Sequence, residues 1–242
     1  MFHVEHFEGW IELLNQGAAE FGLALREFTL SEFAVYLKEL QFWNKKTNLT
    51  GAQDDKEIVV KHFIDSMAAC RALIPVQNPR LLDIGSGAGF PGLVLKLAIP
   101  SLHVTLLEPS QKRVAFLRHL IGKLHLKNID VVAERMDTFA IQEYAQERFG
   151  WATVRALNVS SLLGPIRSVL SENGKLILYR TRPIDRRSLS EIVINKLEVY
   201  QQLEYSLPGN FGSRVLTVIQ KSNGVDQAVD QANIRTVTED LV

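Results

Sequence analysis

Residues 80–92 constrain the fold more than any other part of the chain. They read Arg-Leu-Leu-Asp-Ile-Gly-Ser-Gly-Ala-Gly-Phe-Pro-Gly. The apolar beginning predicts a buried strand, and Gly85, Gly87 and Gly89 predict a tight turn after it. Pro91 suits the first turn of a following helix, where its missing N–H costs nothing. A glycine turn between a strand and a helix lets a ligand lie against bare backbone near the helix N-terminus.

An acidic residue ends the next predicted strand. Residues 103–107 are followed by Glu108, which lies 19 residues after Gly89. This is close to the spacing at which nucleotide-binding βαβ units place a carboxylate for the ribose hydroxyls. Asp83 lies at the carboxyl end of the first strand, where open α/β sheets bind ligands. The sequence therefore predicts a nucleoside site at this edge of a sheet.

From residue 80 onward the pattern alternates between strands and helices. Strands are predicted at 80–84, 103–108, 129–133, 151–156 and 175–180, and helices at 91–98, 110–124, 138–148, 160–170 and 187–196. Two further strands, 197–207 and 215–221, are joined by a short loop. The alternation predicts a mostly parallel sheet covered on both faces, and the loop predicts a closing antiparallel hairpin. We expect an α/β, Rossmann-like fold. Because the hairpin ends the sheet where a dinucleotide enzyme usually has a second half or a substrate domain, the fold suits one nucleoside better than a dinucleotide.

The first part of the chain predicts helices. Residues 2–16 carry apolar side chains at helical spacing, and Thr29 or Ser31 is a suitable N-cap for a helix through Trp43. Another periodic segment covers residues 58–73. The tail lacks periodicity and is polar, which predicts disorder. We expect an N-terminal helical cap at 1–75, a ligand-binding domain at 76–222 and a disordered tail at 223–242.

The composition indicates the cellular compartment in which the protein works. The chain has 242 residues, of which 46% are hydrophobic, enough for a sizeable core. Cys70 is the only cysteine, which excludes an internal disulfide and favours a reducing compartment. The first residues do not resemble a signal peptide, and Lys96 interrupts an apolar run that is too short to span a membrane. We expect a cytoplasmic monomer with no membrane partner.

The formal net charge of zero hides an uneven distribution. Residues 1–39 carry two basic and seven acidic side chains, and residues 223–242 carry one basic and four acidic. Residues 40–222 therefore hold an excess of eight positive charges. A basic central region favours a polyanionic partner, although a solvated surface of uneven charge explains it equally well.

Several motifs together resemble one family. The Asp83-x-Gly85-x-Gly87-x-Gly89 turn with Glu108 is similar to that of class I S-adenosylmethionine-dependent methyltransferases. More narrowly, the chain resembles the bacterial small-subunit ribosomal RNA methyltransferase G family, also called glucose-inhibited division protein B. The motifs that carry this narrower resemblance are 43–50 (Trp-Asn-Lys-Lys-Thr-Asn-Leu-Thr), 62–66 (His-Phe-Ile-Asp-Ser), 83–92, 133–134 and 155–156.

The resemblance covers roughly residues 10–221 and implies a reaction. It implies transfer of a methyl group from S-adenosylmethionine to N7 of one guanine in 16S ribosomal RNA, free or in the small subunit, by a methyltransferase domain at 76–222. Because N7 carries no proton and the donor methyl is already activated, we expect direct displacement with no general base and no metal. Alignment of the reactants would then supply most of the catalysis.

The resemblance also implies site residues. Those expected to bind the cofactor are Gly85, Gly87, Gly89, Phe90, Glu108, Ala133, Glu134 and Arg155. Asn48, in the motif at 43–50, is expected to bind the substrate. Independently of the resemblance, the basic cluster that follows the predicted strand 175–180 predicts that Arg180, Arg186 and Arg187 also bind the substrate, through RNA phosphates. Arg180 replaces a lysine common in the family, which keeps the charge but not the geometry.

Some of these positions have a second interpretation. Phe90 is either a cofactor contact or a core side chain, and Arg155 is either a site residue or an ion-pair partner of an acid such as Asp83. In the helical cap, five polar residues either reach the guanine or hold the cap on the sheet. These are Asn48, Thr50, His62, Asp65 and Ser66.

Other functions fit parts of the pattern. A methyltransferase that acts on another RNA base, a protein or a small molecule shares the donor site. An NAD-dependent oxidoreductase shares the glycine turn and Glu108, but the closing hairpin argues against it. A non-catalytic RNA-binding assembly factor could keep the same fold.

Overall fold

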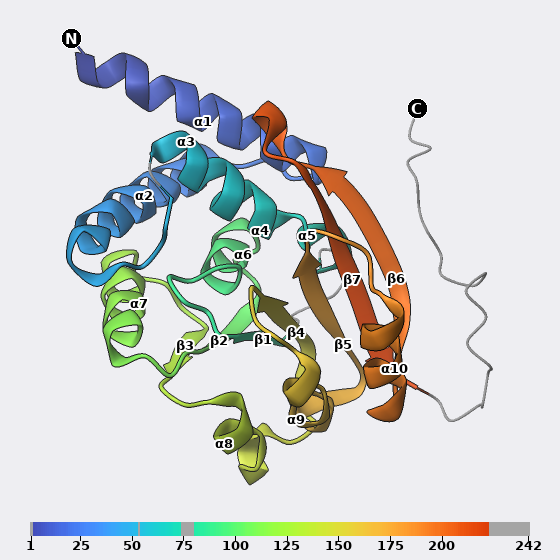
Figure 1. The fold of residues 1–242 in the computed structure, drawn as a ribbon. Coiled ribbons are helices and arrows are strands. Elements are labelled where there is room, and N and C mark those ends of the chain that lie inside the picture. The colour runs from blue at the N-terminus through green and yellow to red at the C-terminus, as the bar shows by residue number, and fades with distance from the viewer. Residues whose placement is uncertain (1, 53, 74–79, 223–242) are drawn as a thin grey trace.

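A computed structural model of the chain describes residues 2–52, 54–73 and 80–222, with side chains from residue 9 onward. The described residues form a seven-stranded sheet in the order β3-β2-β1-β4-β5-β7-β6 (Figure 1). Its strands are β1 (Arg80–Ile84), β2 (His103–Leu107), β3 (Ile129–Val132), β4 (Phe149–Arg155), β5 (Leu170–Arg180), β6 (Leu197–Ser206) and β7 (Ser213–Lys221). Strands β1 to β5 pair in parallel, and β7 pairs antiparallel with β5 and β6. The predicted fold class is confirmed.

Helices precede the sheet and alternate with its strands. The N-terminal helices are α1 (Phe2–Glu20), α2 (Glu27–Thr47), α3 (Asp55–Ile58), the π-helix η1 (Val59–Ile64), α4 (Asp65–Met67) and α5 (Cys70–Leu73). The others are α6 (Gly92–Ala98), α7 (Gln111–Lys123), α8 (Met136–Ala140), η2 (Glu143–Ala145), η3 (Ser160–Leu162), α9 (Leu163–Val169), α10 (Arg186–Ile194) and η4 (Pro208–Asn210). None of these helices is long and apolar enough to cross a membrane.

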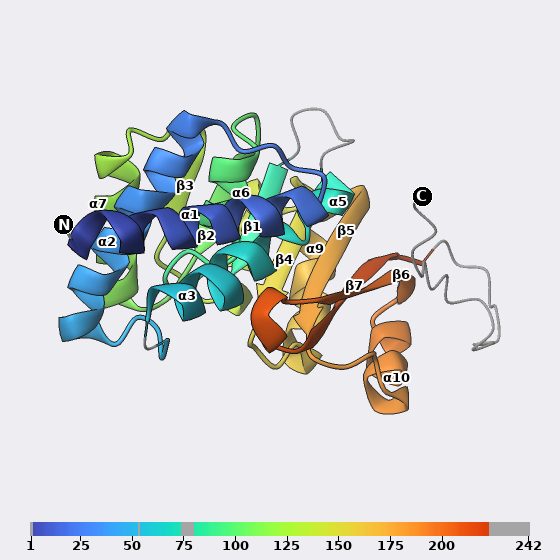
Figure 2. The same cartoon turned by 90° about the horizontal axis from the view of Figure 1, so that it is seen from above.

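Two hydrophobic clusters lie on opposite faces of the sheet. Because side chains alternate along a strand, Leu81 packs into one cluster and Leu82 into the other. The first cluster joins the sheet to α6, α7 and the N-terminal helices, and the second joins it to α8, α9 and α10. The cap helices therefore share a core with the sheet, and Figures 1 and 2 show them above the carboxyl ends of β4 and β5.

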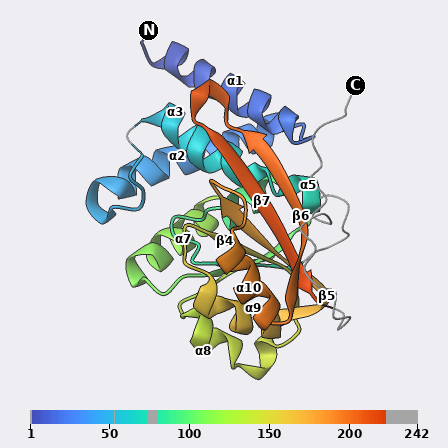
Figure 3. The ribbon, with the colours of Figure 1, turned by 45° about the vertical axis from the view of Figure 1, so that its right-hand side comes forward.

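The closing hairpin reaches the cap. Figure 3 shows β6 and β7 extending alongside β5 until their turn lies against the N-terminal helices. The Tyr205 ring packs edge-on against Phe21 of the segment after α1, with centroids 5.6 Å apart. The Lys61 ammonium lies 5.4 Å from the centre of the Phe211 ring. The hairpin thus helps to fix the position of the cap over the sheet.

Three sequence predictions on helices are wrong in detail. Helix α2 begins at Glu27 with Arg26 as its N-cap, so neither Thr29 nor Ser31 caps it; the Ser31 hydroxyl instead donates to the Phe28 carbonyl within the helix. The segment 58–73 is helical but is not one regular α-helix, because η1 is a π-helix and a turn at 68–69 separates α4 from α5.

The predicted helix 138–148 also differs. Helix α8 ends at Ala140, and the chain becomes extended at Gln142 before the short helix η2. The side-chain amide of Gln146 donates to the Ala140 carbonyl, which a continuing helix would have used for its own ladder. The predicted boundary between the cap and the domain, at 75/76, and the predicted disorder of 223–242 both lie outside the described residues and stay predictions.

Candidate functional site

The glycine turn lies at the carboxyl end of β1 and has a backbone that requires glycine. Gly85 has φ +72°, and a Cβ there would lie 2.5 Å from Leu157 Cδ1. Gly89 has φ +98°, and a Cβ there would lie 2.6 Å from Tyr36 Oη. L-residues avoid positive φ because of steric strain, so the backbone conformation favours glycine at both positions. At Gly89 the buried Tyr36 side chain also leaves no space for a Cβ, whereas at Gly85 the exposed Leu157 side chain could move aside.

Glu108 connects the end of β2 to the glycine turn. Its buried carboxylate accepts one hydrogen bond from the Gly87 N–H and one from the Ser110 N–H, both at 2.9 Å. Arg113 Nη1 lies 3.8 Å from Glu108 Oε1. Each carboxylate oxygen retains a second lone pair, so a ribose hydroxyl could still donate to it. The structure adds a role in positioning the turn, and the ribose role stays a prediction.

A cavity of about 390 Å³ opens beside these residues. It is lined by Ile84, Gly85, Leu107, Glu108, Pro109, Arg113, Glu134, Arg135, Met136, Asp137, Leu157, Asn158, Ser161 and Leu162. Within the described part of the chain, Glu134 Oε2 is buried and has no hydrogen-bond partner. A buried carboxylate oxygen without a partner is costly, so this atom points to a ligand that donates a hydrogen bond.

A second cavity of about 370 Å³ lies at the ends of β4 and β5. It is lined by Val154, Ala156, Leu157, Val159, Leu178, Tyr179, Arg180, Thr181 and Arg182. Leu157 borders both cavities, which places them side by side. Among the predicted substrate residues, Arg180 lines this cavity, whereas Arg186, Arg187 and Asn48 do not.

The remaining predicted residues lie apart from these cavities. Arg186 and Arg187 begin α10 on an exposed surface, and Arg187 lies 3.5 Å from Glu191. Asn48 is the exposed C-cap of α2, with a left-handed backbone at φ 49°. Ala133 follows β3 and lies next to Glu134 in the chain, but does not line the larger cavity. Their binding roles stay predictions.

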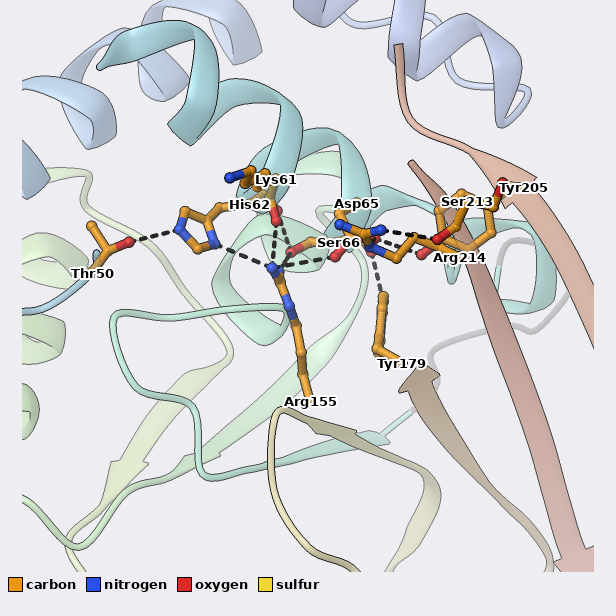
Figure 4. Close-up of polar contacts among 10 residues, drawn as sticks. All are labelled: Thr50, Lys61, His62, Asp65, Ser66, Arg155, Tyr179, Tyr205, Ser213 and Arg214. Carbon is orange, nitrogen blue, oxygen red and sulfur yellow. Dashed lines mark hydrogen bonds and ion pairs between the residues drawn. The ribbon is translucent and has the colours of Figure 1, made fainter. Parts of the chain in front are cut away.

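Arg155 belongs to a polar network that joins the sheet to the cap. Figure 4 shows Arg155 and Tyr179 projecting from the ends of β4 and β5 toward η1 and α4. The Arg155 guanidinium donates to the Lys61 carbonyl, and its Nη2 lies 3.2 Å from Asp65 Oδ2. The Tyr205 hydroxyl donates to Asp65 Oδ1 at 2.6 Å, and Arg214 Nε lies 3.9 Å from the same oxygen. Arg155 therefore pairs with Asp65 of the cap.

Asp83 is not the partner of Arg155. Its buried carboxylate accepts from the Gly92 N–H at 3.0 Å and from the Thr153 hydroxyl at 2.9 Å. Burial raises the pKa of Asp83 to about 6, against the lowering effect of those donors. Asp83 thus ties the start of α6 to β1 and β4. The alternative that Arg155 pairs with an acid is confirmed, but the acid is Asp65 and not Asp83.

Phe90 is part of an aromatic stack. Its ring lies 4.5 Å from the His62 ring and 5.6 Å from the Tyr36 ring, with interplanar angles of 9° and 12°. Tyr36 also donates from its hydroxyl to the Ala88 carbonyl in the glycine turn at 2.5 Å. The stack positions the turn under the cap. Phe90 does not line the larger cavity, so its cofactor role stays a prediction.

The comparisons with known proteins agree on one family. The family model for rRNA small subunit methyltransferase G matches residues 29–203. The ribosomal RNA small subunit methyltransferase G of Acetivibrio thermocellus is 35% identical over 215 residues, which cover 87% of this chain and 88% of the relative. That of Syntrophus aciditrophicus is 39% identical over 173 residues, 71% of each chain. The chain belongs to the rRNA small subunit methyltransferase G family.

Solved structures support the fold of this methyltransferase G family member. The crystal structure of the [4+2]-cyclase SpnF matches with a TM-score of 0.56 and 14% identity, over 82% of this chain and 97% of that chain. The crystal structure of a mutant of MtNAS matches with a TM-score of 0.54 and 12% identity, over 88% and 75%. At these identities the likeness concerns the fold alone. Membership in the methyltransferase G family does not favour the oxidoreductase alternative.

The sequence missed part of the site. Arg214 and Tyr205 complete the network around Asp65, and Leu157 borders both cavities. No local pattern in the methyltransferase G chain marks these three residues, since each one is an ordinary side chain on a strand or in a loop. For Asp65 and Ser66 the sequence leaves two roles, either to reach the guanine or to hold the cap on the sheet. Both contact Arg155, so they have the second of these roles.

His62 in this network should not titrate near neutral pH. Burial, with a smaller effect of Arg155, lowers the pKa of His62 from 6.5 to about 3. Because protonation then favours the unfolded chain, this contribution to stability is full above about pH 6.5 and is lost as pH falls toward 3. We expect the His62 ring signals in NMR to stay constant from about pH 8 to 5. A ring that titrates with the midpoint of a free histidine would contradict the burial argument.

Proposed function

We propose that the protein transfers a methyl group from S-adenosylmethionine to N7 of one guanine in 16S ribosomal RNA. The observation that carries this proposal is the family match over residues 29–203. The two adjoining cavities at the carboxyl ends of the strands support it, because the reaction needs a donor and an acceptor side by side. We further propose that the chain acts as a cytoplasmic monomer.

The residues of the larger cavity fit the donor. S-adenosylmethionine supplies an electrophilic methyl group on a sulfonium ion. The unpartnered Glu134 carboxylate would accept from the exocyclic amine of adenine, and Glu108 would accept from the ribose hydroxyls. The glycine turn, with Gly85 in the cavity wall, leaves backbone open to the methionine part. Positioning the donor is the main task of these residues.

The smaller cavity fits a base with its flanking phosphate. Tyr179 and the apolar wall suit a base, and Arg180 and Arg182 suit a phosphate group. Guanine N7 presents a lone pair and carries no proton, so none of these residues has to remove one. The cap at 1–75 and the domain at 76–222 would then enclose the target base between them.

Methyl transfer from labelled S-adenosylmethionine to ribosomal RNA tests this proposal. The RNA is offered naked and in small subunits that lack the modification, followed by base analysis. We expect label in 7-methylguanine at a single site. Label in another base or in protein would favour the alternative methyltransferase activities. Donor binding without any transfer would favour an assembly factor.

Glu134→Leu should separate donor binding from folding. Loss of the acceptor should weaken S-adenosylmethionine binding about 10- to 100-fold, because a hydrogen bond to a charged group is removed. The free energy of unfolding without ligand should not fall, because Glu134 Oε2 has no partner to lose among the described residues. Calorimetric titration and denaturant unfolding measure the two quantities. Glu134→Gln, which retains an acceptor, is the matched control, and an equal loss in both variants would contradict the role.

A double charge reversal, Arg186→Glu with Arg187→Glu, should weaken binding to the RNA substrate. Both side chains are exposed, so the change should act on phosphate contacts and lower the slope of log K against log salt by about 2. Filter binding over a salt series measures this slope. The control pair Arg80→Glu with Lys127→Glu makes the same change in charge at exposed positions beside the amino ends of β1 and β3. An equal effect from both pairs would show only a general charge effect.

A further inference from the structure

The contact with Arg155 determines which ring nitrogen of His62 accepts a hydrogen bond. Arg155 Nη2 lies 3.2 Å from His62 Nδ1, and a guanidinium always donates. His62 Nδ1 must therefore hold a lone pair. Burial and the Arg155 charge lower the pKa of His62 to about 3, which keeps the ring neutral at physiological pH. The single ring proton is then on Nε2.

The position of the His62 ring proton also sets the direction of the hydrogen bond to Thr50. His62 Nε2 lies 2.7 Å from Thr50 Oγ1, so Nε2–H donates to the hydroxyl oxygen. The Ala52 N–H donates to the same oxygen at 3.2 Å. A hydroxyl has two lone pairs and one hydrogen, so both acceptor positions of Thr50 are used. Its O–H hydrogen has no acceptor among the described residues, and Thr50 is thus an obligate donor.

The hydroxyl is also held in place. The Asn44 side chain donates from Nδ2 to the Thr50 carbonyl and accepts from the Thr50 N–H, both at 2.9 Å. The His62 ring in turn stacks on Phe90 of the glycine turn. Figure 4 shows Thr50, His62 and Arg155 in one row above the strand ends, and Thr50 is only half-buried. Thr50 lines neither cavity, but His62 joins it to Arg155, and the next residue in the chain, Ala156, lines the smaller cavity.

We propose that Thr50 is a specificity-determining residue whose hydroxyl donates to the O6 carbonyl of the target guanine. This inference rests on the proposed function. The edge of guanine that carries N7 presents O6 as a second acceptor, whereas the same edge of adenine presents an N6 amine, which is a donor. A donor on O6 leaves the N7 lone pair free to attack. Against adenine, the hydroxyl would face another donor and lose its partner, which disfavours that base.

The test removes each half of the hydrogen bond in turn. Thr50→Val keeps the shape of the side chain without the hydroxyl, and Thr50→Ser keeps the hydroxyl. Once the wild-type protein has marked its target guanine, small subunits are rebuilt with 2-aminopurine at that position, which retains N7 but lacks O6. The value of kcat/KM for methyl transfer is measured for each protein on each substrate, together with S-adenosylmethionine affinity.

We expect Thr50→Val to lower kcat/KM on guanine by about 10- to 100-fold and Thr50→Ser to stay close to wild type. The affinity for S-adenosylmethionine should be unchanged in both variants. The wild type should lose about the same factor on 2-aminopurine, and Thr50→Val should lose nothing further. If the loss from Thr50→Val and the loss from 2-aminopurine multiply in the combined measurement, the proposed hydrogen bond between Thr50 and O6 is overturned. Equal rates of the wild type on both bases would overturn it without any variant. If the wild type labels no guanine at all, the proposed function fails instead.

NMR of the unmodified protein tests the polarity separately. We expect ¹⁵N signals of a neutral His62 ring with the proton on Nε2, because Arg155 occupies Nδ1. A proton on Nδ1 would reverse the donor at Thr50 and overturn the inference, whatever the variants do. This readout also remains available if Thr50→Val does not fold.

Discussion

We expect Glu108→Gln to weaken S-adenosylmethionine binding about 100-fold, nearly as much as Glu108→Ala. The reason is geometric. One carboxylate oxygen accepts from the Gly87 N–H and the other from the Ser110 N–H. A glutamine has only one acceptor oxygen, so its NH₂ group must face one of these donors. The glycine turn then loses its anchor to β2, and the donor site loses its shape.

Calorimetric titration with S-adenosylmethionine measures this effect. Glu172→Gln, an exposed change at the start of β5 away from both cavities, is the matched control and should bind like the wild type. Glu108→Gln with wild-type affinity would mean that a single acceptor is enough. Since the turn would then not depend on both bonds, the positioning role of Glu108 would have to be abandoned.

Asp65→Ala should lower the free energy of unfolding by about 3–5 kcal/mol, because removal of one partner from a buried ion pair leaves the other charge uncompensated. The Asp65 carboxylate is buried, forms ion pairs with Arg155 and Arg214, and accepts a hydrogen bond from the Tyr205 hydroxyl. These partners come from β4, β7 and β6, so the loss should loosen the cap from both the sheet and the hairpin. Methyl transfer should fall with it.

Denaturant unfolding measures the stability loss. Asp65→Asn keeps the shape and one acceptor for Tyr205, so it should cost less than Asp65→Ala. Arg187→Ala removes an exposed arginine 3.5 Å from Glu191 and should change stability by less than about 1 kcal/mol. A loss below about 1 kcal/mol for Asp65→Ala would show that water can replace the carboxylate, contrary to its burial.

Most of the sheet could be predicted because its signals are local. Strand β1 has the predicted limits, and the hairpin differs from prediction by a few residues at most. The pattern of apolar residues reports burial along one segment, and it does not require knowledge of the neighbours. Where a distant or competing side chain intervenes, the local signal fails. The Gln146 side chain donates to the last carbonyl of α8, and this contact could not be read from the apolar spacing.

The sequence by itself determined the strand, glycine turn and helix at 80–92, the alternating sheet, the acid after β2 and the family. Only the tertiary structure decided that Arg155 pairs with Asp65 and not with Asp83, and that Phe90 stacks between His62 and Tyr36. The physical reason is distance along the chain. Tyr205 and Asp65, in hydrogen-bond contact, are 140 residues apart, and their meeting depends on the strand order and on the π-turn of the cap.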